Sequence, residues 1–330
     1  MTRKSENIDP GKPISSWVEK DSLYGKVVDA KTIILLTRGC SWSRKIGCSM
    51  CGYTNDSIDL DLTYENIIDQ IREGMKGGGY QSYIKIFTSG SFLDPKEMER
   101  RIALDTISFI HDKAPKSRIL IESRPEYIDV KILKSMKKVH EDIEVAIGLE
   151  DTNDIIRSKL IRKGFSFDQY VEAGNKIKET GLSLKTYLLL KPPLLGEKYS
   201  LESTVGSIKV VHELFPGSCI SINPVNIQSS TPVEDLFKKG LYRPPWLWTL
   251  LEVLRKGHGI TKAKTRLMSS PTAGGKKRGA HNCGECDDEV LERIRYFSLE
   301  NSINHLTTER NCCRNEWLSY LKGSCFDPTL

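Results

Sequence analysis

The feature that most constrains the fold is a regular alternation of short apolar, β-rich runs with longer segments whose apolar residues recur at helical spacing. The β-rich runs predict six strands, at 31–37, 82–88, 118–123, 143–150, 182–190 and 219–225. The segments between them predict helices around 63–76, 96–114, 127–139, 152–161, 167–180 and 201–214. Each connection is long enough for a right-handed crossover between parallel strands. The alternation therefore predicts an α/β barrel or a doubly wound parallel sheet.

In both folds, functional residues gather at the carboxyl ends of the strands. Unusual residues follow four of the predicted strands, and we expect them to lie on one rim. They are Cys40, Cys48 and Cys51 after the first strand, Ser89, Gly90 and Ser91 after the second, Glu122, Ser123 and Arg124 at the third, and Gly148, Leu149 and Glu150 at the fourth.

The stretch TRGCSWSRKIGCSMCGYTND, residues 37–56, holds three cysteines within twelve positions. A structural zinc site closes its tetrahedron with four ligands, usually as two short pairs. Three thiolates can instead hold a 4Fe–4S cluster and leave one iron open for chemistry. Spacing alone leaves both interpretations open, together with a third, in which the three are unrelated buried thiols.

The chain has 330 residues, a net charge of +6 and nine cysteines. Its first residues, MTRKSENIDPGKPISS, have no apolar run behind the basic ones, so we expect no signal peptide and a cytoplasmic protein. The longest apolar runs, TIILL and TYLLL, are of strand length, and we expect no membrane association. These features favour metal or redox chemistry over a disulfide framework for the cysteines. Cys219, within a predicted strand, is most simply a buried apolar residue.

The character of the chain changes near residue 226. Prolines cluster, a helix is expected near 245–256, and residues 253–282 carry eight cations and no acid. In GITKAKTRLM the cations alternate, so on a strand they would share one face. A stripe of cations predicts contact with RNA phosphates, and a solvated edge strand is the alternative. The expected RNA-binding residues are Lys262, Lys264, Arg266, Lys276, Lys277 and Arg278.

A second C-x-x-C pair, Cys283 and Cys286, follows the basic segment. With Cys312, Cys313 and His281 it could supply the ligands of a tetrahedral zinc ion. A second iron–sulfur cluster and a group of reduced thiols are the alternatives, and the ligands among Cys312, Cys313, Cys325 and His281 stay open. We divide the chain into an N-terminal extension (1–30), a core (31–225) and a small α-rich C-terminal domain (226–330).

The residues on the predicted rim resemble the radical S-adenosylmethionine (SAM) superfamily. Its usual motif is C-x3-C-x2-C after the first strand of a partial α/β barrel, whereas this chain has C-x7-C-x2-C. The run Glu122-Ser123-Arg124-Pro125 resembles a motif of the branch that modifies tRNA, which includes the Elp3-like and MiaB-like enzymes. The segment GLEDTNDIIRSKLIRKGFS is similar to the fourth-strand region of that branch. The resemblance covers residues 30–225, roughly.

The resemblance implies a partial (β/α)6 TIM-like barrel, a 4Fe–4S cluster on Cys40, Cys48 and Cys51, and SAM at the open iron. It also implies SAM contacts from Ser89, Gly90 and Ser91, although this loop departs from the common Gly-Gly-Glu form. The remaining cofactor contacts that it implies are Glu122, Arg124, Glu150, Arg157 and Lys163. The alternatives are an ordinary βα turn at 89–91, an ion pair across the barrel for Glu122 and Arg124, and a solvated helix face for Arg157 and Lys163.

With HNCGEC near the C-terminus, the whole combination is similar to the family of radical SAM enzymes that complete archaeosine in archaeal tRNA. That similarity implies cleavage of the lysine side chain from a lysine–7-deazaguanine adduct in the D-loop, through a 5′-deoxyadenosyl radical. It implies tRNA, a lysine-transferring archaeosine synthase subunit, and an electron donor such as ferredoxin or flavodoxin as partners. The alternatives are another tRNA- or RNA-modifying radical SAM enzyme of the Elp3-like branch, and a non-catalytic iron–sulfur or zinc protein that binds RNA.

Overall fold

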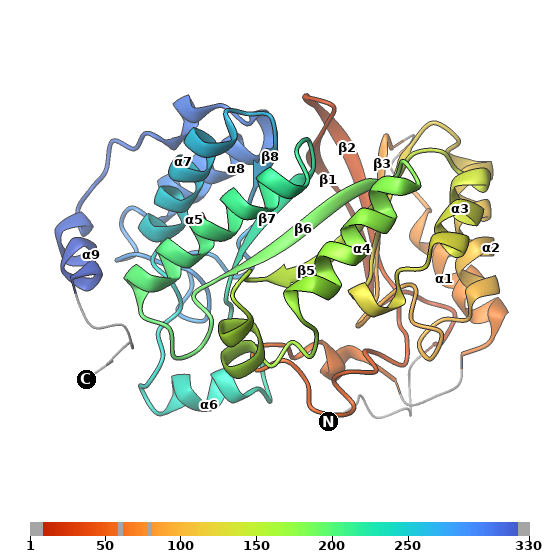
Figure 1. Cartoon of the computed structure of the whole chain (residues 1–330), viewed down its shortest axis with the longest axis horizontal. Coiled ribbons are helices and arrows are strands. Elements are labelled where there is room, and N and C mark those ends of the chain that lie inside the picture. The colour runs from red at the N-terminus through yellow and green to blue at the C-terminus, as the bar shows by residue number, and fades with distance from the viewer. Residues whose placement is uncertain (1–8, 59–61, 78, 80, 323–330) are drawn as a thin grey trace. The chain divides into compact units, whose positions relative to one another are not determined.

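The structure, a computed structural model, describes residues 9–58, 62–77, 79 and 81–322. Cys325, one of the candidate zinc ligands, lies outside these residues. Figure 1 labels the elements along the chain.

Eight strands form one mixed sheet, ordered as they occur in the chain. β1 and β2 form an antiparallel hairpin, and the pairs β2–β3, β3–β4, β4–β5 and β7–β8 are parallel. The strands are β1 (Ser15–Leu23), β2 (Lys26–Ile34), β3 (Tyr83–Phe87), β4 (Arg118–Glu122), β5 (Ile143–Glu150), β6 (Ser183–Leu190), β7 (Cys219–Pro224) and β8 (Arg266–Met268). The predicted α/β class is confirmed, and the six expected strands correspond to β2–β7. The sequence analysis missed β1 and β8.

Helices lie between the parallel strands along the chain, and the last two follow the final strand. They are α1 (Tyr64–Gly74), α2 (Arg100–Lys113), α3 (Val130–Val139), α4 (Phe167–Glu179), α5 (Glu197–Leu214), α6 (Pro232–Lys238), α7 (Leu247–Thr261), α8 (Asp287–Glu300) and α9 (Arg314–Leu321), with the 3-10 turns η2 (Tyr53–Asp56), η3 (Pro125–Tyr127) and η5 (Ile303–Leu306) and the π-helix η4 (Ile156–Ile161). Thr63 caps α1 in a reciprocal pair with Asn66, where the sequence predicts the helix to begin.

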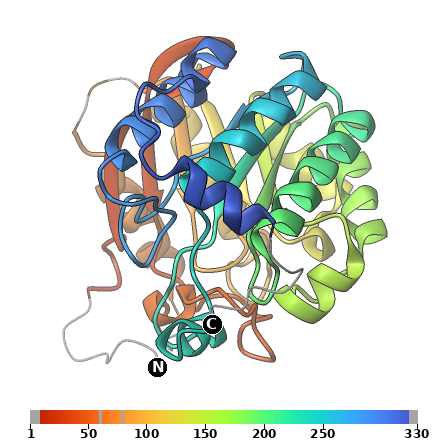
Figure 2. The same cartoon turned by 90° about the vertical axis from the view of Figure 1, so that its left-hand side faces the viewer.

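The chain forms two compact units. The first comprises the chain up to Gly47, then Gly52–Gly148 and Asp168–Lys185; the second comprises Cys48–Cys51, Leu149–Phe167 and the chain from Thr186 onward. In the first unit α2 packs against both α1 and α3 (Figure 1). In the second, α5 packs against α7 and α9, and α7 also against α8 (Figure 2).

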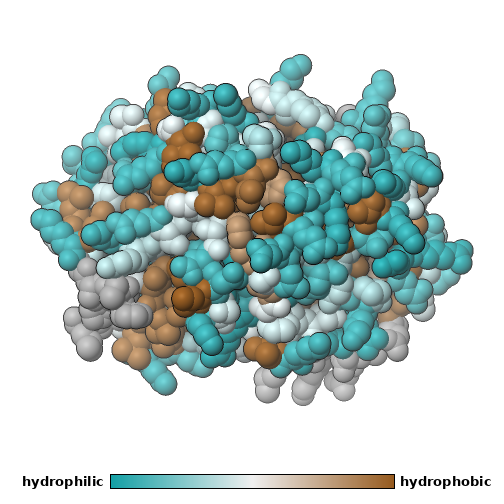
Figure 3. Space-filling view, in the orientation of Figure 1, coloured by the Kyte–Doolittle hydropathy of each residue, from teal (hydrophilic) through white to brown (hydrophobic). Residues whose placement is uncertain are grey.

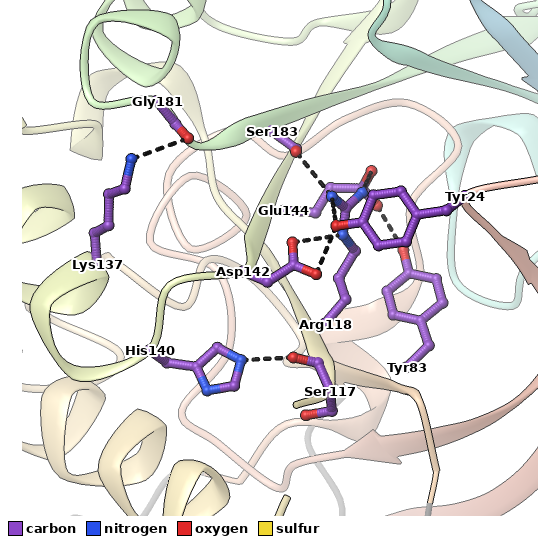
Figure 4. Close-up of polar contacts among 10 residues, drawn as sticks. All are labelled: Tyr24, Tyr83, Ser117, Arg118, Lys137, His140, Asp142, Glu144, Gly181 and Ser183. Carbon is purple, nitrogen blue, oxygen red and sulfur yellow. Dashed lines mark hydrogen bonds and ion pairs between the residues drawn. The ribbon is translucent and has the colours of Figure 1, made fainter. Parts of the chain in front are cut away.

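Polar contacts join the amino-terminal ends of the strands in the first unit (Figure 4). The guanidinium of Arg118, at the start of β4, bonds to the Asp142 carboxylate at 2.9 Å and to the Tyr24 hydroxyl at 2.7 Å. Tyr24 lies in the β1–β2 turn, and its hydroxyl donates to Asp142 at 2.7 Å. The Arg118 side chain also donates to Ser183 at the start of β6. This network ties the hairpin to the end of the sheet away from the predicted rim.

The strand that would give Lys262, Lys264 and Arg266 one shared face does not form. Helix α7 continues to Thr261, and Lys262 and Ala263 then adopt left-handed backbone conformations, so that β8 begins only at Arg266. The reason is packing: a Cβ at Gly257 of α7 would lie 2.9 Å from side-chain atoms of Ile208 and Leu267, so this turn of the helix is pressed closely against its neighbours.

Among the described residues, no helix combines the length and the apolar character needed to cross a membrane. On the face drawn in Figure 3, polar side chains predominate and the hydrophobic residues form separate groups.

Candidate functional site

Cys40 lies on the loop after β2, next to a compact turn. The carbonyl of Trp42 accepts N–H bonds from Lys45, Ile46 and Gly47 at 3.0–3.1 Å, so most of the long gap SWSRKIG folds back on itself. The Ser43 hydroxyl donates to the Cys40 carbonyl at 2.7 Å. The extra residues of the C-x7-C spacing therefore form a closed turn, and the Cys40 side chain is half-buried.

Cys48 and Cys51 belong to a short turn anchored in the second unit. The Cys51 N–H donates to the Cys48 carbonyl at 3.2 Å. Between them, Ser49 donates through its N–H to Ile161 and through its hydroxyl to the Leu160 carbonyl, at 2.8 and 2.6 Å. Met50 packs against the apolar cluster of the second unit. Both cysteines remain half-buried with reduced thiols, as metal ligands require.

The loop after β3 lies against the Cys40 backbone. A Cβ added to Gly90 would come within 2.6 and 2.7 Å of the Cα and N atoms of Cys40, closer than real side chains allow. Glycine is therefore required where the two loops meet. Ser91 links this loop to the next strand, because its hydroxyl accepts the Arg124 N–H at 3.1 Å. The first unit thus brings Cys40 together with candidate residues that follow β3 and β4.

Glu97 is a buried carboxyl beneath this loop that the sequence analysis missed. Its oxygens accept the Thr37 hydroxyl and the Ser91 N–H, both at 2.5 Å. Burial raises the pKa of Glu97 to about 7, and the hydrogen bonds from Thr37 and Ser91 oppose that rise. The signal in the sequence was that Glu97 lies next to the apolar Met98 and close to Phe92 and Leu93 in SGSFLDPKEM.

Arg124 pairs with its neighbour Glu126, at 2.6 Å. Its guanidinium also lies 5.3 Å from the ring centre of Trp42, on the cysteine loop. The Glu122 carbonyl accepts the Phe92 N–H at 2.8 Å, and the Glu122 side chain is half-buried. The motif therefore contributes backbone and side-chain contacts to the same rim.

Glu150, Arg157 and Lys163 come together around η4 in the second unit. Lys163 Nζ lies 2.5 Å from the Glu150 carboxylate. Arg157 is fully buried: it donates to the carbonyls of Asp151 at 2.5 Å and of Phe165 at 3.1 Å, and it pairs with Asp154. The solvated-face alternative is wrong for Arg157, because the π-helix turns that side chain inward.

Four cysteines near the C-terminus form one group of sulfur atoms, all within 4.8 Å of one another. They are Cys283, Cys286, Cys312 and Cys313, and we call them the quartet. Cys286 and Cys313 are buried, whereas Cys283 and Cys312 are exposed. His281 is outside this group of the described residues, and its Nδ1 lies 2.8 Å from the Gly279 carbonyl. Cys219 is buried in β7 and 6 % exposed, as expected.

The cations of the basic segment divide into two kinds. Lys262, Lys264, Lys276 and Lys277 are exposed. Arg266 instead donates to the Ser298 carbonyl at 3.2 Å, and Arg278 bonds to Glu234 and the Ile227 carbonyl. Of the six predicted RNA-binding residues, the lysines face solvent and the two arginines make internal contacts.

Comparison with known proteins gives matches along nearly the whole chain. Residues 34–197 match the family model of the radical SAM superfamily. Archaeosine synthase subunit beta of Methanosarcina acetivorans is 36 % identical over 94 % of this chain and 90 % of its own. Archaeosine synthase subunit beta of Thermococcus kodakarensis is 34 % identical over 94 % of this chain and 97 % of its own.

Among solved structures, archaeal Elp3 of Methanocaldococcus infernus, with its N-terminus deleted, resembles this chain in fold. The TM-score is 0.52 at 17 % identity, over 72 % of this chain and 59 % of that one. The likeness bears out the predicted partial barrel.

Proposed function

Because the chain belongs to the radical SAM superfamily and, within it, to the family of archaeosine synthase subunit beta, we propose that it performs a radical SAM step in the formation of archaeosine in tRNA. Enzymes of this superfamily use a 4Fe–4S cluster and SAM. The observation that carries the proposal is the similarity over 94 % of the chain to relatives that carry this name.

The proposed cluster ligands are Cys40, Cys48 and Cys51. Their chemistry fits the group, because three reduced, half-buried thiols can occupy three irons and leave the fourth open. When bound, the cluster supplies the one-electron chemistry that cleaves SAM. The residues of the chain have the task of holding the reactants and of excluding water.

The loop of Ser89, Gly90 and Ser91 is the proposed contact for the methionyl end of SAM. Gly90 supports this role because it allows the loop to lie directly on the Cys40 backbone. Glu97 holds the loop from below through the Ser91 N–H. Glu122, Arg124, Glu150 and Lys163 remain the other proposed cofactor contacts. Arg157 is fully buried and would instead position its neighbours.

We further propose the specific reaction of the family: removal of the lysine side chain from a lysine–7-deazaguanine adduct of the D-loop by carbon–nitrogen cleavage. The lysine-transferring subunit would supply the adduct, and ferredoxin or flavodoxin would supply electrons in the cytoplasm. The exposed lysines of the basic segment would contact tRNA phosphates.

The test is anaerobic reconstitution with iron and sulfide, followed by incubation with SAM, a reductant and tRNA that carries the lysine adduct. Formation of 5′-deoxyadenosine and of archaeosine are followed together. The matched variants are Cys48→Ala and Cys219→Ala, since each removes one thiol, from the proposed cluster and from the β7 core respectively. We expect both products from wild type and Cys219→Ala, and neither from Cys48→Ala.

The two levels of the proposal fail differently. Full activity in Cys48→Ala would contradict the cluster ligands. Formation of 5′-deoxyadenosine with an untouched adduct would leave the radical SAM chemistry standing and would contradict the substrate.

A further inference from the structure

The quartet combines two ligand pairs that are far apart in the chain. Cys283 and Cys286 precede α8, and Cys312 and Cys313 precede α9. The pairs meet at sulfur–sulfur distances of 3.2 Å for Cys283–Cys312 and 3.7 Å for Cys286–Cys313, and Cys283 lies 3.9 Å from Cys286. Because the pairs come from separate segments, local sequence does not explain their meeting.

These distances match a single metal ion. Four thiolates at about 2.3 Å from one tetrahedral ion lie about 3.8 Å apart. All sulfur atoms of the quartet lie within 4.8 Å of one another. A 4Fe–4S cluster places each thiolate on a different iron and so holds the sulfur atoms farther apart. The geometry therefore favours one closed, four-coordinate ion over a second cluster.

The backbone around the first pair is shaped as a metal-binding turn. Gly284, between the two ligands, has a φ of +98°, which few other residues adopt. The Asp287 carboxylate accepts the N–H groups of Gly284 and Asn282, both at 3.0 Å, and so closes the turn. Cys286 occupies the N-cap position of α8, and Cys313 occupies the N-cap position of α9. The positive ends of both helix dipoles favour thiolates there.

Two side chains from outside the turns donate to the buried sulfur atoms. Asn282 Nδ2 lies 3.3 Å from Cys286 Sγ, and Trp248 Nε1, on α7, lies 3.2 Å from Cys313 Sγ. The Asn282 Oδ1 also accepts the backbone N–H of Trp248 at 3.2 Å. Donors of this kind orient metal ligands and stabilise their charged form.

We infer that the quartet is a structural zinc site in which Cys283, Cys286, Cys312 and Cys313 hold one Zn²⁺ and join α7, α8 and α9. Four thiolates leave no open position, so the ion has a structural role. The connection continues inward: Trp317 of α9 donates to the Thr249 hydroxyl at 2.8 Å, and Thr249 donates to Glu197 at 2.5 Å. Glu197 forms a buried ion pair with Lys191, just after β6.

This inference goes beyond the proposed function and does not depend on it, because it concerns a second metal of different chemistry. The test uses the full chain, purified with its native metals and assayed for zinc, iron and acid-labile sulfide. The variants are Cys283→Ala, which removes an exposed ligand and leaves no internal cavity, Cys219→Ala as the control thiol, and Cys48→Ala at the proposed cluster.

We expect about one zinc per chain in wild type, Cys219→Ala and Cys48→Ala, and loss of zinc in Cys283→Ala with iron and sulfide retained. Zinc content equal in Cys283→Ala and wild type would overturn the site. Iron and sulfide in place of zinc, lost from Cys283→Ala, would overturn the choice of metal.

A second measurement does not depend on a ligand variant. Replacement of zinc by cobalt should give the intense visible absorption of tetrahedral Co²⁺ with thiolate ligands, and Asn282→Ala should weaken cobalt affinity about 10- to 100-fold. Binding by Asn282→Ala with unchanged affinity would contradict its role toward Cys286. Weak absorption typical of octahedral coordination would contradict a four-thiolate site.

Discussion

The two cysteine motifs of this chain differ in the number of ligands and in how the fold holds them. The N-terminal triplet has three thiols on loops, and two of its members lie on a turn that is anchored separately from Cys40. The quartet has four thiols at two helix ends, all within 4.8 Å. Three ligands leave a metal position open for chemistry, whereas four close it. This difference is the basis for proposing a reactive role for the triplet and a structural role for the quartet.

The largest expected effect separates the two motifs by activity. Cys48→Ala should reduce 5′-deoxyadenosine formation by at least about 1000-fold, because it removes a group that the chemistry requires. Its zinc content should stay at the wild-type level. The measurement is product formation after reconstitution, with metal analysis of the same sample. Loss of zinc together with activity would break the comparison, since the two motifs would then not be independent.

In measurements of stability, we expect the quartet to matter more than a buried thiol that binds no metal. Cys286→Ala should lower the free energy of unfolding by about 4 kcal/mol or more, the size typical of a lost metal site. Cys219→Ala also removes a buried thiol and should cost only about 1 kcal/mol. Urea unfolding monitored by tryptophan fluorescence measures both, because Trp248 and Trp317 lie beside or near the quartet. Equal costs would argue against a bound metal.

A titrating carboxyl beneath the Gly90 loop should give the free energy of unfolding a pH dependence. The pKa of Glu97 is raised from 4.5 to about 7 by burial, so the folded protein binds this proton more tightly than the unfolded chain does. The stabilising contribution of Glu97 to the free energy of unfolding is therefore complete below pH 4.5 and is lost as the pH rises through 7. Between pH 4.5 and 8, the free energy of unfolding of wild type should fall by about 3 kcal/mol more than that of Glu97→Gln.

The control for Glu97 is Glu99→Gln, an exposed acid two residues along the chain. Urea unfolding at several pH values compares each variant with wild type. Parallel pH profiles for wild type and Glu97→Gln would contradict the raised pKa.

The contact between the two loops should be sensitive to one methyl group. Gly90→Ala would place a Cβ against the Cys40 backbone and Glu97. We expect it to lower the free energy of unfolding by about 1 to 3 kcal/mol and to weaken the binding of SAM. Gly206→Ala, in the exposed middle of α5, meets nothing within 4 Å and should be neutral or slightly stabilising. Thermal unfolding and SAM titration test both. An unperturbed Gly90→Ala would mean that the loops can separate freely.

The smallest effect concerns the exposed lysines that precede the quartet. Lys276→Ala with Lys277→Ala should lower the salt dependence of tRNA binding by up to about two units of slope, one for each lost phosphate contact. The pair Lys131→Ala with Lys138→Ala, on exposed positions of α3, removes the same charge as a control. Binding at several salt concentrations is the measurement. Equal slopes for the two double variants would assign the effect to net charge alone.

Several aspects of the chain were predictable from local sequence. The alternation of apolar runs located β2–β7, because the periods of strand and helix are properties of the backbone. The ordered matches after the predicted strands identified the radical SAM superfamily, which the comparisons confirm. The turn that carries Cys48 and Cys51 was also predictable from local sequence, because two cysteines at C-x-x-C spacing lie close together in a single turn.

Other features depended on packing between distant segments. A strand through Lys262 and Lys264 would have given these cations one face, but α7 extends to Thr261 because its buried face continues through Gly257 to Thr261. It allowed a solvated Arg157, and the π-helix instead buries that side chain. These outcomes depend on the shape of the neighbouring surfaces, which local periodicity does not encode.

The sequence by itself determined which residue types were available: three thiols after the first parallel strand and five more near the C-terminus. Only the tertiary structure decided which of them meet. It gathered both Cys312 and Cys313 with Cys283 and Cys286, left His281 on a backbone carbonyl, and placed Glu97 beneath the Gly90 loop. The physical reason is that ligand geometry and carboxyl burial depend on contacts between segments far apart in the chain, and those contacts form only when the helices pack.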